Sequence, residues 1–170
     1  MKFLCKNENE ISTVSDYVLN IIKDKRQNEA VVVGLHGDLG SGKTTFTKNF
    51  AKKIGIVNEI TSPTFVVQRR YEIPQSADTI NFKNLYHFDM YRIELIEELG
   101  PLDWEETISN KTNLIFVEWP EKIEDALPIN MIRINFTFID ENTREIEIVA
   151  PNKLGGMMAL LKRIANGFKK

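Results

Sequence analysis

The sequence predicts an α/β fold in which a mostly parallel central sheet is flanked by helices, with antiparallel hairpin additions. Two short apolar runs, residues 30–35 and 114–117, are typical of strands buried on both faces, as in parallel sheets. A glycine-rich loop at residues 37–44 joins the first run to a helical pattern. Residues 132–138 and 144–149 alternate apolar and polar side chains on either side of a turn, which predicts a hairpin.

The length and composition set the frame for these elements. A chain of 170 residues is near the size of one domain, so we expect a single domain over residues 1–170. The 22 basic and 24 acidic side chains give a net charge of -2, which provides no broad positive field for unaided nucleic-acid binding. The single cysteine, Cys5, excludes an intrachain disulfide, and no apolar run approaches the ~20 residues of a membrane span. Without a signal-peptide pattern, we expect a cytoplasmic protein with no membrane contact.

Two helices are predicted in the first third of the chain. Thr13 and Asp16 have the spacing of a capping box, which predicts that the first helix begins there. Its apolar face is formed by Val14, Val18, Ile21 and Ile22. The second helix follows the glycine-rich loop and is expected to end at Gly55, a plausible C-cap. Its apolar stripe is formed by Phe46, Phe50, Ala51 and Ile54.

Two further strands are predicted at residues 65–71 and 85–91, joined by a polar, exposed loop over 72–84. Side chains alternate between the two faces of a strand. One face of the second strand carries Tyr86, Phe88 and Met90, and the other carries His87, Asp89 and Tyr91. The apolar set can face the core, which leaves the Asp89 carboxylate free.

Two further segments, beside the apolar strand that ends at Glu118, have helical patterns. Residues 94–109 predict two short helices interrupted by Gly100 and Pro101. Residues 153–170 predict a basic amphipathic helix at the C-terminus, with apolar side chains at helical spacing and lysines on the other sides.

The loop Gly37-Asp38-Leu39-Gly40-Ser41-Gly42-Lys43-Thr44 matches the phosphate-binding pattern G-x-x-x-x-G-K-[ST], the P-loop. Its glycines allow the backbone angles that aim several N–H groups at one point, and the following helix adds its positive N-terminal end. Lys43 would reach the β and γ phosphates of ATP, and the Thr44 hydroxyl would coordinate Mg²⁺. The residues expected to bind the nucleotide here are Asp38, Leu39, Gly40, Ser41, Gly42, Lys43, Thr44 and Thr45.

Magnesium needs a further oxygen ligand, usually a carboxylate at the carboxyl end of a neighbouring strand. Asp89 and Glu118 both have this position in the predicted sheet. The spacing does not decide which of them touches the ion and which orients water or contacts the ion through water. The alternative interpretation of each carboxylate is a solvated charge at a strand end without a role in metal binding. The presence of the P-loop makes this alternative less favoured.

Four motifs in order extend this pattern beyond the loop: the P-loop with Thr45-Phe46, Ser62-Pro63-Thr64-Phe65, His87-Phe88-Asp89-Met90-Tyr91-Arg92 and Glu118-Trp119-Pro120-Glu121. This set resembles the bacterial TsaE family, the ATPase of tRNA threonylcarbamoyladenosine biosynthesis. The resemblance runs from the first helix to the hairpin near Val149 and does not include the predicted helix over 153–170.

The resemblance implies an α/β P-loop fold and Mg²⁺-dependent ATP hydrolysis coupled to a partner complex of TsaD and TsaB. That complex attaches threonylcarbamoyl to the adenosine beside the anticodon in tRNAs reading ANN codons, so contact with tRNA would be indirect. The resemblance also implies that Thr64 senses the γ-phosphate, that Asp89 is the acidic magnesium group and that Trp119 lies near the nucleotide or supports its site. Glu118 would assist at the metal or the attacking water, so that Lys43, Glu118 and Thr64 form the expected catalytic set.

Other interpretations stay open on the residues alone. A P-loop small-molecule kinase would use the same phosphate grip, although no arginine-rich lid is visible. A GTPase is disfavoured, because the Asn110-Lys111-Thr112-Asn113 segment ends in Asn and precedes its strand. A nucleotide-dependent assembly factor, with hydrolysis as a timer, is a third class. His36 and His87 are interpreted as hydrogen-bonded structural histidines, and without the family Thr64 would only form a turn and Trp119 would only pack.

Overall fold

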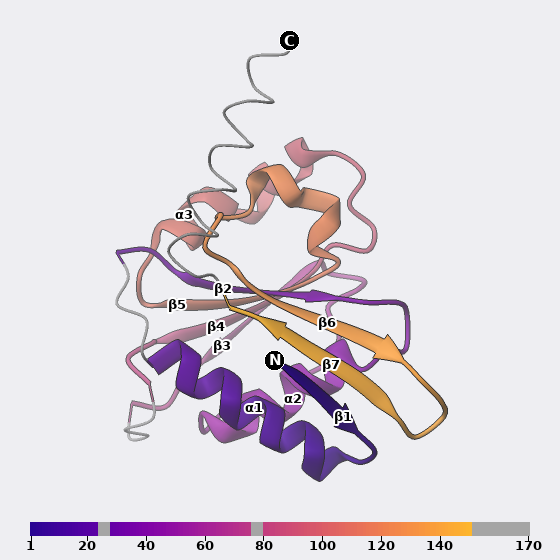
Figure 1. Cartoon of the computed structure of the whole chain (residues 1–170). Helices are drawn as coiled ribbons and strands as arrows, with labels where there is room; N and C mark the ends of the chain where they lie inside the picture. Colours follow the sequence, from indigo (N-terminus) through magenta and orange to yellow (C-terminus); the bar gives the residue numbers. More distant parts are fainter. Residues whose placement is uncertain (24–27, 76–79, 151–170) are drawn as a thin grey trace.

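The computed structural model describes residues 1–23, 28–75 and 80–150. The described elements surround a seven-stranded sheet with the strand order β1-β7-β6-β2-β5-β4-β3, shown in Figure 1. Its strands are β1 (Lys2–Cys5), β2 (Val31–His36), β3 (Gln68–Glu72), β4 (Asn84–Asp89), β5 (Asn113–Glu118), β6 (Ile132–Phe138) and β7 (Arg144–Val149). The helices are α1 (Glu8–Lys23), α2 (Lys43–Lys53) and α3 (Trp104–Ser109), with the 3₁₀ helices η1 (Ile96–Leu102) and η2 (Pro120–Ala126). The predicted α/β class is confirmed.

The sheet is parallel at its centre and antiparallel at both edges. Strands β4, β5, β2 and β6 run parallel, whereas β3 pairs antiparallel with β4, and β7 pairs antiparallel with β6. Strand β1 then adds antiparallel to β7, and the Met1 amino group donates to the Ile148 carbonyl at 2.8 Å. The sequence analysis missed β1, because four residues are too few to show a period and its partner lies at the far end of the chain.

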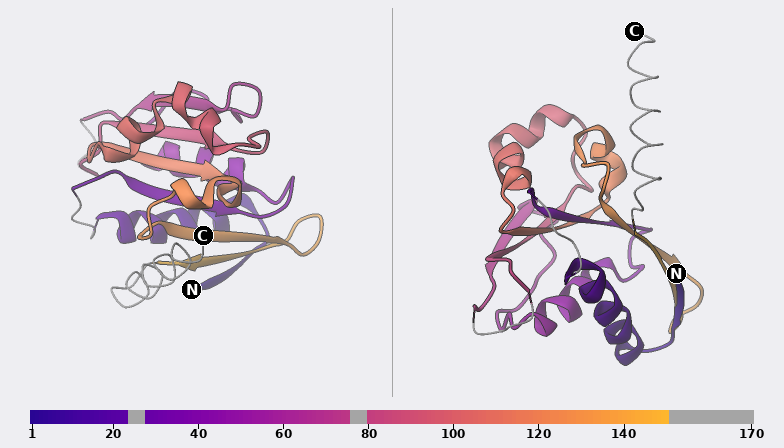
Figure 2. Two further views of the ribbon diagram at one scale, coloured as in Figure 1. Left: turned by 90° about the horizontal axis from the view of Figure 1, so that it is seen from above. Right: turned by 60° about the vertical axis from the view of Figure 1, so that its left-hand side comes forward.

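Helices cover both faces of the central strands, as Figures 1 and 2 show. On one face α2 packs Phe46 against Phe116 of β5, with ring centroids 6.0 Å apart. On the other face Trp104 of α3 meets Phe88 of β4 edge-on at 5.1 Å. The two apolar clusters explain why the runs that form β2 and β5 carry no alternation: both faces of these strands are buried.

Helix α1 begins earlier than predicted. The Asn7 side chain accepts the Glu10 N–H at 3.1 Å, and the Glu10 carboxylate accepts the Lys6 N–H. An Asn-x-x-Glu cap therefore starts the helix nearly two turns before Thr13. The Thr13 hydroxyl instead donates to the Asn9 carbonyl inside the helix. The predicted capping box at Thr13 is therefore wrong.

The end of α2 agrees with the prediction. Gly55 has a positive φ of 86° and its N–H donates to the Lys52 carbonyl at 3.1 Å, while the Ile56 N–H donates to Ala51 at 3.0 Å. These two bonds make a Schellman motif, for which glycine is favoured because it tolerates left-handed backbone.

Two predicted boundaries in the middle of the chain are wrong. The strand predicted at 65–71 is β3 over Gln68–Glu72, because residues 65–67 turn back so that the Val66 and Val67 N–H groups both donate to Pro63. The connection over 72–84 is only partly exposed, since Ile73 and Phe82 are buried in the core.

The patterns at residues 85–109 also need correction. Strand β4 ends at Asp89, and both His87 and Asp89 are buried. Phe116, the register partner of His87, packs against α2, whereas Asp89 contacts the Ser62 and Thr64 hydroxyls. Of the two short helices at 94–109, the first is the 3₁₀ helix η1, which contains Pro101, and the break comes at Asp103, where φ is 50°.

Four further expectations concern the C-terminal segment, the number of domains, a membrane span and the single cysteine. The helix predicted over 153–170 lies outside the described residues, and the single-domain expectation stays a prediction. Among the described helices, none has the length and apolar content needed to cross a bilayer. Cys5 is a free, buried thiol in the part of the chain that the structure describes.

Candidate functional site

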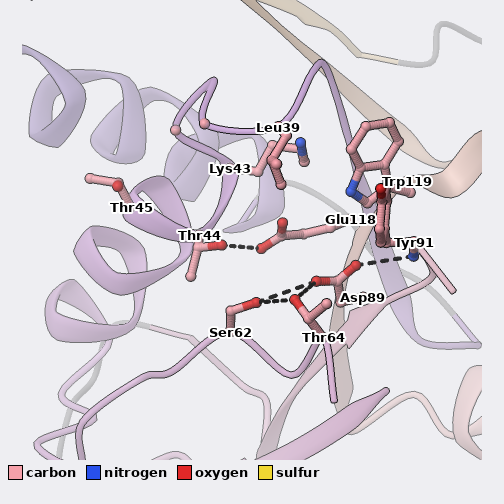
Figure 3. A pocket seen from close by; sticks show the side chains of 12 residues that line it. Leu39, Lys43, Thr44, Thr45, Ser62, Thr64, Asp89, Tyr91, Glu118 and Trp119 are labelled. Atoms are coloured by element: carbon pink, nitrogen blue, oxygen red, sulfur yellow. Dashed lines mark hydrogen bonds between the residues drawn. The ribbon is translucent and has the colours of Figure 1, made fainter. Parts of the chain in front are cut away.

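A cavity of about 430 Å³ opens at the carboxyl ends of β2, β4 and β5, where α2 begins (Figure 3). Its lining residues are Leu39, Gly40, Gly42, Lys43, Thr44, Thr45, Ser62, Thr64, Asp89, Tyr91, Glu118 and Trp119. The structure thus brings together all the predicted site residues except Asp38 and Ser41, which belong to the loop but do not line the cavity. The roles of all these residues, those that line the cavity included, stay predictions.

The glycine-rich loop takes backbone angles that side chains rarely adopt. Gly37, Gly40 and Gly42 have φ values of 139°, 74° and 107°, and Gly42 is the N-cap of α2. The first N–H groups of a helix have no partner inside it. A loop of this shape before a helix N-terminus is suited to hold an anion.

Lys43, the first residue of α2, is almost fully buried and points across the loop. Its Nζ atom donates to the Gly37 carbonyl at 2.6 Å and to the Asp38 carbonyl at 2.8 Å, and it lies 4.3 Å from the centroid of the Trp119 ring. Burial lowers the pKa of Lys43, and the nearby carboxylates of Glu118 and Asp89 offset part of that shift. The site thus holds a poorly solvated ammonium, which favours an anionic ligand.

Glu118 connects the sheet to α2. Its Oε1 atom accepts the Thr44 hydroxyl at 2.7 Å and lies 2.9 Å from His87 Nε2 (the bond to Thr44 is drawn in Figure 3). The side chain is buried, yet Glu118 lines the cavity. A hydroxyl and a carboxylate are therefore in contact beside the N-terminus of α2.

Asp89 occupies the next strand at the same level, because Asp89 and Glu118 are register partners on β4 and β5. Its Oδ2 atom accepts the Thr64 hydroxyl at 2.5 Å and the Ser62 hydroxyl at 3.3 Å. Its Oδ1 atom accepts the Tyr91 N–H at 3.1 Å. The second carboxylate is thus held by the segment that precedes β3, on the side of the cavity opposite α2 (Figure 3).

The polar groups in this cavity are hydroxyl and carboxylate oxygens, the hard ligands that Mg²⁺ prefers. Among the described residues, no cluster of three or more His, Cys, Asp or Glu side chains is arranged to hold a metal by itself. Magnesium usually keeps waters and takes one or two carboxylates together with phosphate oxygens. The arrangement of Thr44, Asp89 and Glu118 fits that mode of binding.

Trp119 is held in a strained backbone conformation directly after β5. Its φ and ψ are 57° and 47°, a left-handed geometry that is unusual for a bulky residue. Its N–H donates to the Leu35 carbonyl at 3.3 Å, and its ring lies 5.2 Å from the Tyr91 ring. The turn lets the ring lie over Lys43 at the cavity wall.

Sequence reasoning left three residues of this region without a site role: Ser62, His87 and Tyr91. Two of them carried a usable signal. Ser62 lies two residues before Thr64, and His87 lies two residues before Asp89 on the same face of its strand. Strand alternation placed Tyr91 on the face of Asp89, but β4 ends at Asp89, so the position of Tyr91 at the cavity does not follow from that alternation.

Comparisons with known proteins point to one family. The family model described as "Threonylcarbamoyl adenosine biosynthesis protein TsaE" matches residues 5–146. The chain is 40% identical over 124 residues to the tRNA threonylcarbamoyladenosine biosynthesis protein TsaE of Rickettsia typhi, which covers 72% of this chain and 80% of that protein. It is 36% identical over 130 residues to the protein of the same name from Haemophilus influenzae, covering 75% of each chain.

A solved structure agrees with these sequence relatives. The crystal structure of Bacillus subtilis YdiB superposes with a TM-score of 0.67 and 27% identity, covering 98% of this chain and 95% of the other. The B. subtilis protein named tRNA threonylcarbamoyladenosine biosynthesis protein TsaE is 37% identical over 122 residues, which is 70% of this chain and 69% of that protein. The chain therefore belongs to the TsaE family of tRNA threonylcarbamoyladenosine biosynthesis proteins.

Proposed function

We propose that this protein binds and hydrolyses ATP at the cavity beside α2, as a component of threonylcarbamoyladenosine biosynthesis on tRNA. The observation that carries the proposal is the contact between Thr44 and Glu118 next to the buried Lys43 ammonium. It supplies a cation for phosphate and two oxygen ligands for a metal in one place, at a helix N-terminus that favours anions.

Magnesium would be held by the Thr44 hydroxyl and the Glu118 carboxylate, with Asp89 beside it, and it would supply positive charge for the phosphate oxygens of ATP. The oxygen-only donor set of these three side chains supports this assignment. Glu118 already contacts Thr44, so we assign it as the carboxylate nearest the ion. Asp89 is held by Thr64 and Ser62 and has its second oxygen on the Tyr91 N–H, which suits it to orient water or to act through water.

The other side chains of the cavity have separate tasks in this proposal. Lys43 would exchange its carbonyl partners, Gly37 and Asp38, for phosphate oxygens when ATP binds. Thr64 would sense the γ-phosphate, because any group that draws its hydroxyl away breaks the bond to Asp89. Trp119, whose ring lies over Lys43, would form a wall of the phosphate site.

We also propose that ATP use is coupled to TsaD and TsaB, and that this protein meets tRNA through that complex. The net charge of -2 supports an indirect contact, since unaided binding to a phosphate backbone needs an excess of basic side chains. We also place the protein in the cytoplasm, since its bacterial relatives are named as tRNA threonylcarbamoyladenosine biosynthesis proteins and bacterial tRNA is cytoplasmic.

A reconstituted system tests the proposal. ATP hydrolysis by the wild-type chain should rise when TsaD and TsaB are added, and threonylcarbamoyladenosine should form on tRNA once an activated threonylcarbamoyl donor is supplied. Lys43→Ala, which removes the ammonium, should lose ATP binding and support no modification. Normal modification by Lys43→Ala, or transfer of labelled phosphate to a metabolite without any partner, would overturn the proposal, and the second result would identify a kinase.

A further inference from the structure

A fully buried histidine lies behind the cavity. His87 sits on β4, two residues before Asp89, and its side chain has no exposed surface. Its register partner on β5 is Phe116, which packs against Phe46 of α2, so His87 lies on the face of the sheet that α2 covers. A polar ring in such surroundings costs free energy unless it is hydrogen bonded.

The hydrogen bonds of His87 are unequal. Its Nε2 atom lies 2.9 Å from Glu118 Oε1, while its Nδ1 atom has no partner in the described part of the chain. An ionised carboxylate can only accept, so Nε2 carries the proton and donates it to Glu118. The Thr44 hydroxyl donates to the same oxygen at 2.7 Å. Glu118 is therefore fixed from two directions, from α2 by Thr44 and from the sheet by His87.

We propose that His87 is a positioning residue that orients Glu118 toward magnesium, a role that rests on the function proposed above. The Thr44 hydroxyl must turn toward the ion if it becomes a ligand, and its bond to Glu118 is then weakened. The bond from His87 does not face the cavity, so it can persist and keep the carboxylate in place. Groups that orient metal ligands typically contribute about 10-fold to 100-fold in metal affinity or activity.

Two variants separate this role from simple packing. His87→Phe keeps a buried ring but removes the donor, whereas His87→Gln keeps an amide N–H near the position of Nε2. Asn84→Ala is the matched control, because Asn84 donates to Asn113 at 2.9 Å across the same two strands at their opposite end. It removes a buried bond between β4 and β5 without touching Glu118.

The measurement is ATP affinity, determined by calorimetry across a range of magnesium concentrations. His87→Phe should raise the magnesium concentration needed for half-maximal ATP affinity by about 10-fold to 100-fold, and His87→Gln should restore most of the loss. Asn84→Ala should lower thermal stability without this shift. The role of His87 would be overturned if His87→Phe needed the same magnesium concentration as the wild type, or if Asn84→Ala raised that concentration as much as His87→Phe. If the ATP affinity of the wild type did not depend on the magnesium concentration, the proposed function would be overturned, and the role of His87 with it.

A second measurement does not use His87→Phe, so it tests the role of His87 even if that variant fails to fold. The chain has two histidines, so a long-range ¹H–¹⁵N spectrum contains two imidazole rings, and His36→Gln identifies which is which. We expect the nucleotide-free protein to show the His87 ring with its proton on Nε2. A ring protonated only on Nδ1 could not donate to Glu118 and would overturn the proposal.

Discussion

The Thr44 hydroxyl donates to Glu118 Oε1 across 2.7 Å, although 74 residues separate the two in the chain. Thr44 lies in the first turn of α2 and Glu118 ends β5, so the contact joins this helix to the sheet beside the cavity. Asp89, the register partner of Glu118, makes its contacts on the other side with Thr64 and Ser62. The two carboxylates therefore have different surroundings and should respond differently to substitution.

Glu118→Gln and Asp89→Asn test this difference. If Glu118 is the carboxylate nearest the ion, Glu118→Gln should raise the magnesium concentration required for ATP binding. Asp89→Asn should leave that requirement closer to the wild type and lower the hydrolysis rate per bound ATP, because its place beside Thr64 suits it to orient water. Calorimetric ATP binding and single-turnover hydrolysis provide the two readouts. The reverse pattern would assign Asp89 to the metal.

The bonds from Thr64 and Ser62 to Asp89 predict unequal stability effects. The Thr64 bond is 2.5 Å long, and a hydrogen bond to a charged group contributes about 1.5–3 kcal/mol. Thr64→Val, which keeps the shape of the side chain, should lower the free energy of unfolding by an amount in that range. Ser62→Ala removes a weak 3.3 Å contact with Asp89 and the 2.7 Å bond between the Ser62 and Thr64 hydroxyls. Both partners in that shorter bond are neutral, so the substitution should cost about 0.5–1.5 kcal/mol.

Urea unfolding of both variants measures these losses, and steady-state ATP hydrolysis measures the effect on function. Thr64→Val should hydrolyse ATP more slowly than Ser62→Ala. Equal losses of stability would mean that the two hydroxyls share Asp89 equally, and unchanged hydrolysis in Thr64→Val would remove Thr64 from the catalytic set.

Local signals were sufficient to predict the centre of this fold. The apolar runs that became β2 and β5 and the loop before α2 are each contained in a few consecutive residues. Once these strands are parallel, their carboxyl ends meet at one edge, and so the proximity of Asp89, Glu118 and the loop followed from the pattern.

Most of the parts that could not be predicted depend on contacts between distant residues, and one depends on a local turn. Strand β1 exists because it pairs with β7. The burial of His87 depends on α2 packing on its face of the sheet, and that of Asp89 on contacts with Ser62 and Thr64. The turn at Phe65–Val67 resembles a strand in composition, but bonds to Pro63 bend the chain there. Propensity favours a strand at such a segment, and the local turn overrides it.

His36 predicts a pH dependence of stability. Its Nδ1 atom lies 3.1 Å from Glu121 Oε2, but burial outweighs this contact and lowers the pKa of His36 below its usual 6.5. The unfolded chain therefore binds the proton more readily than the folded chain does. The contribution of the neutral His36 ring to the free energy of unfolding is therefore fully present above pH 6.5. It is lost as the pH falls from 6.5 through the lowered pKa of His36 in the folded state.

Urea unfolding between about pH 7.5 and pH 5 checks this sign. The wild type should lose more stability than His36→Gln as the pH falls across that window. Glu121→Gln removes a carboxylate that favours the charged ring, so it should widen the loss. Parallel curves for the wild type and His36→Gln would contradict the prediction.

Gly37 and Gly40 both have positive φ, yet only one of them is in tight contact with the rest of the fold. A Cβ atom on Gly37 would lie 2.4 Å from the Phe136 carbonyl oxygen of β6 and 2.9 Å from Ser41 Oγ, whereas one on Gly40 would meet no atom within 4 Å. Gly40→Ala should therefore cost about 1–2 kcal/mol, the strain of a left-handed residue. Gly37→Ala should cost clearly more, because the backbone of β6 or of the loop must move as well.

The same pair of variants connects loop shape to phosphate binding. The Gly37 carbonyl accepts the Lys43 ammonium at 2.6 Å, so a displaced Gly37 changes the position from which Lys43 reaches its ligand. Gly37→Ala should weaken ATP binding more than Gly40→Ala in addition to losing more stability, as measured by urea unfolding and calorimetry. Equal effects of the two substitutions would mean that backbone strain alone, and not the contact with β6, makes glycine necessary at position 37.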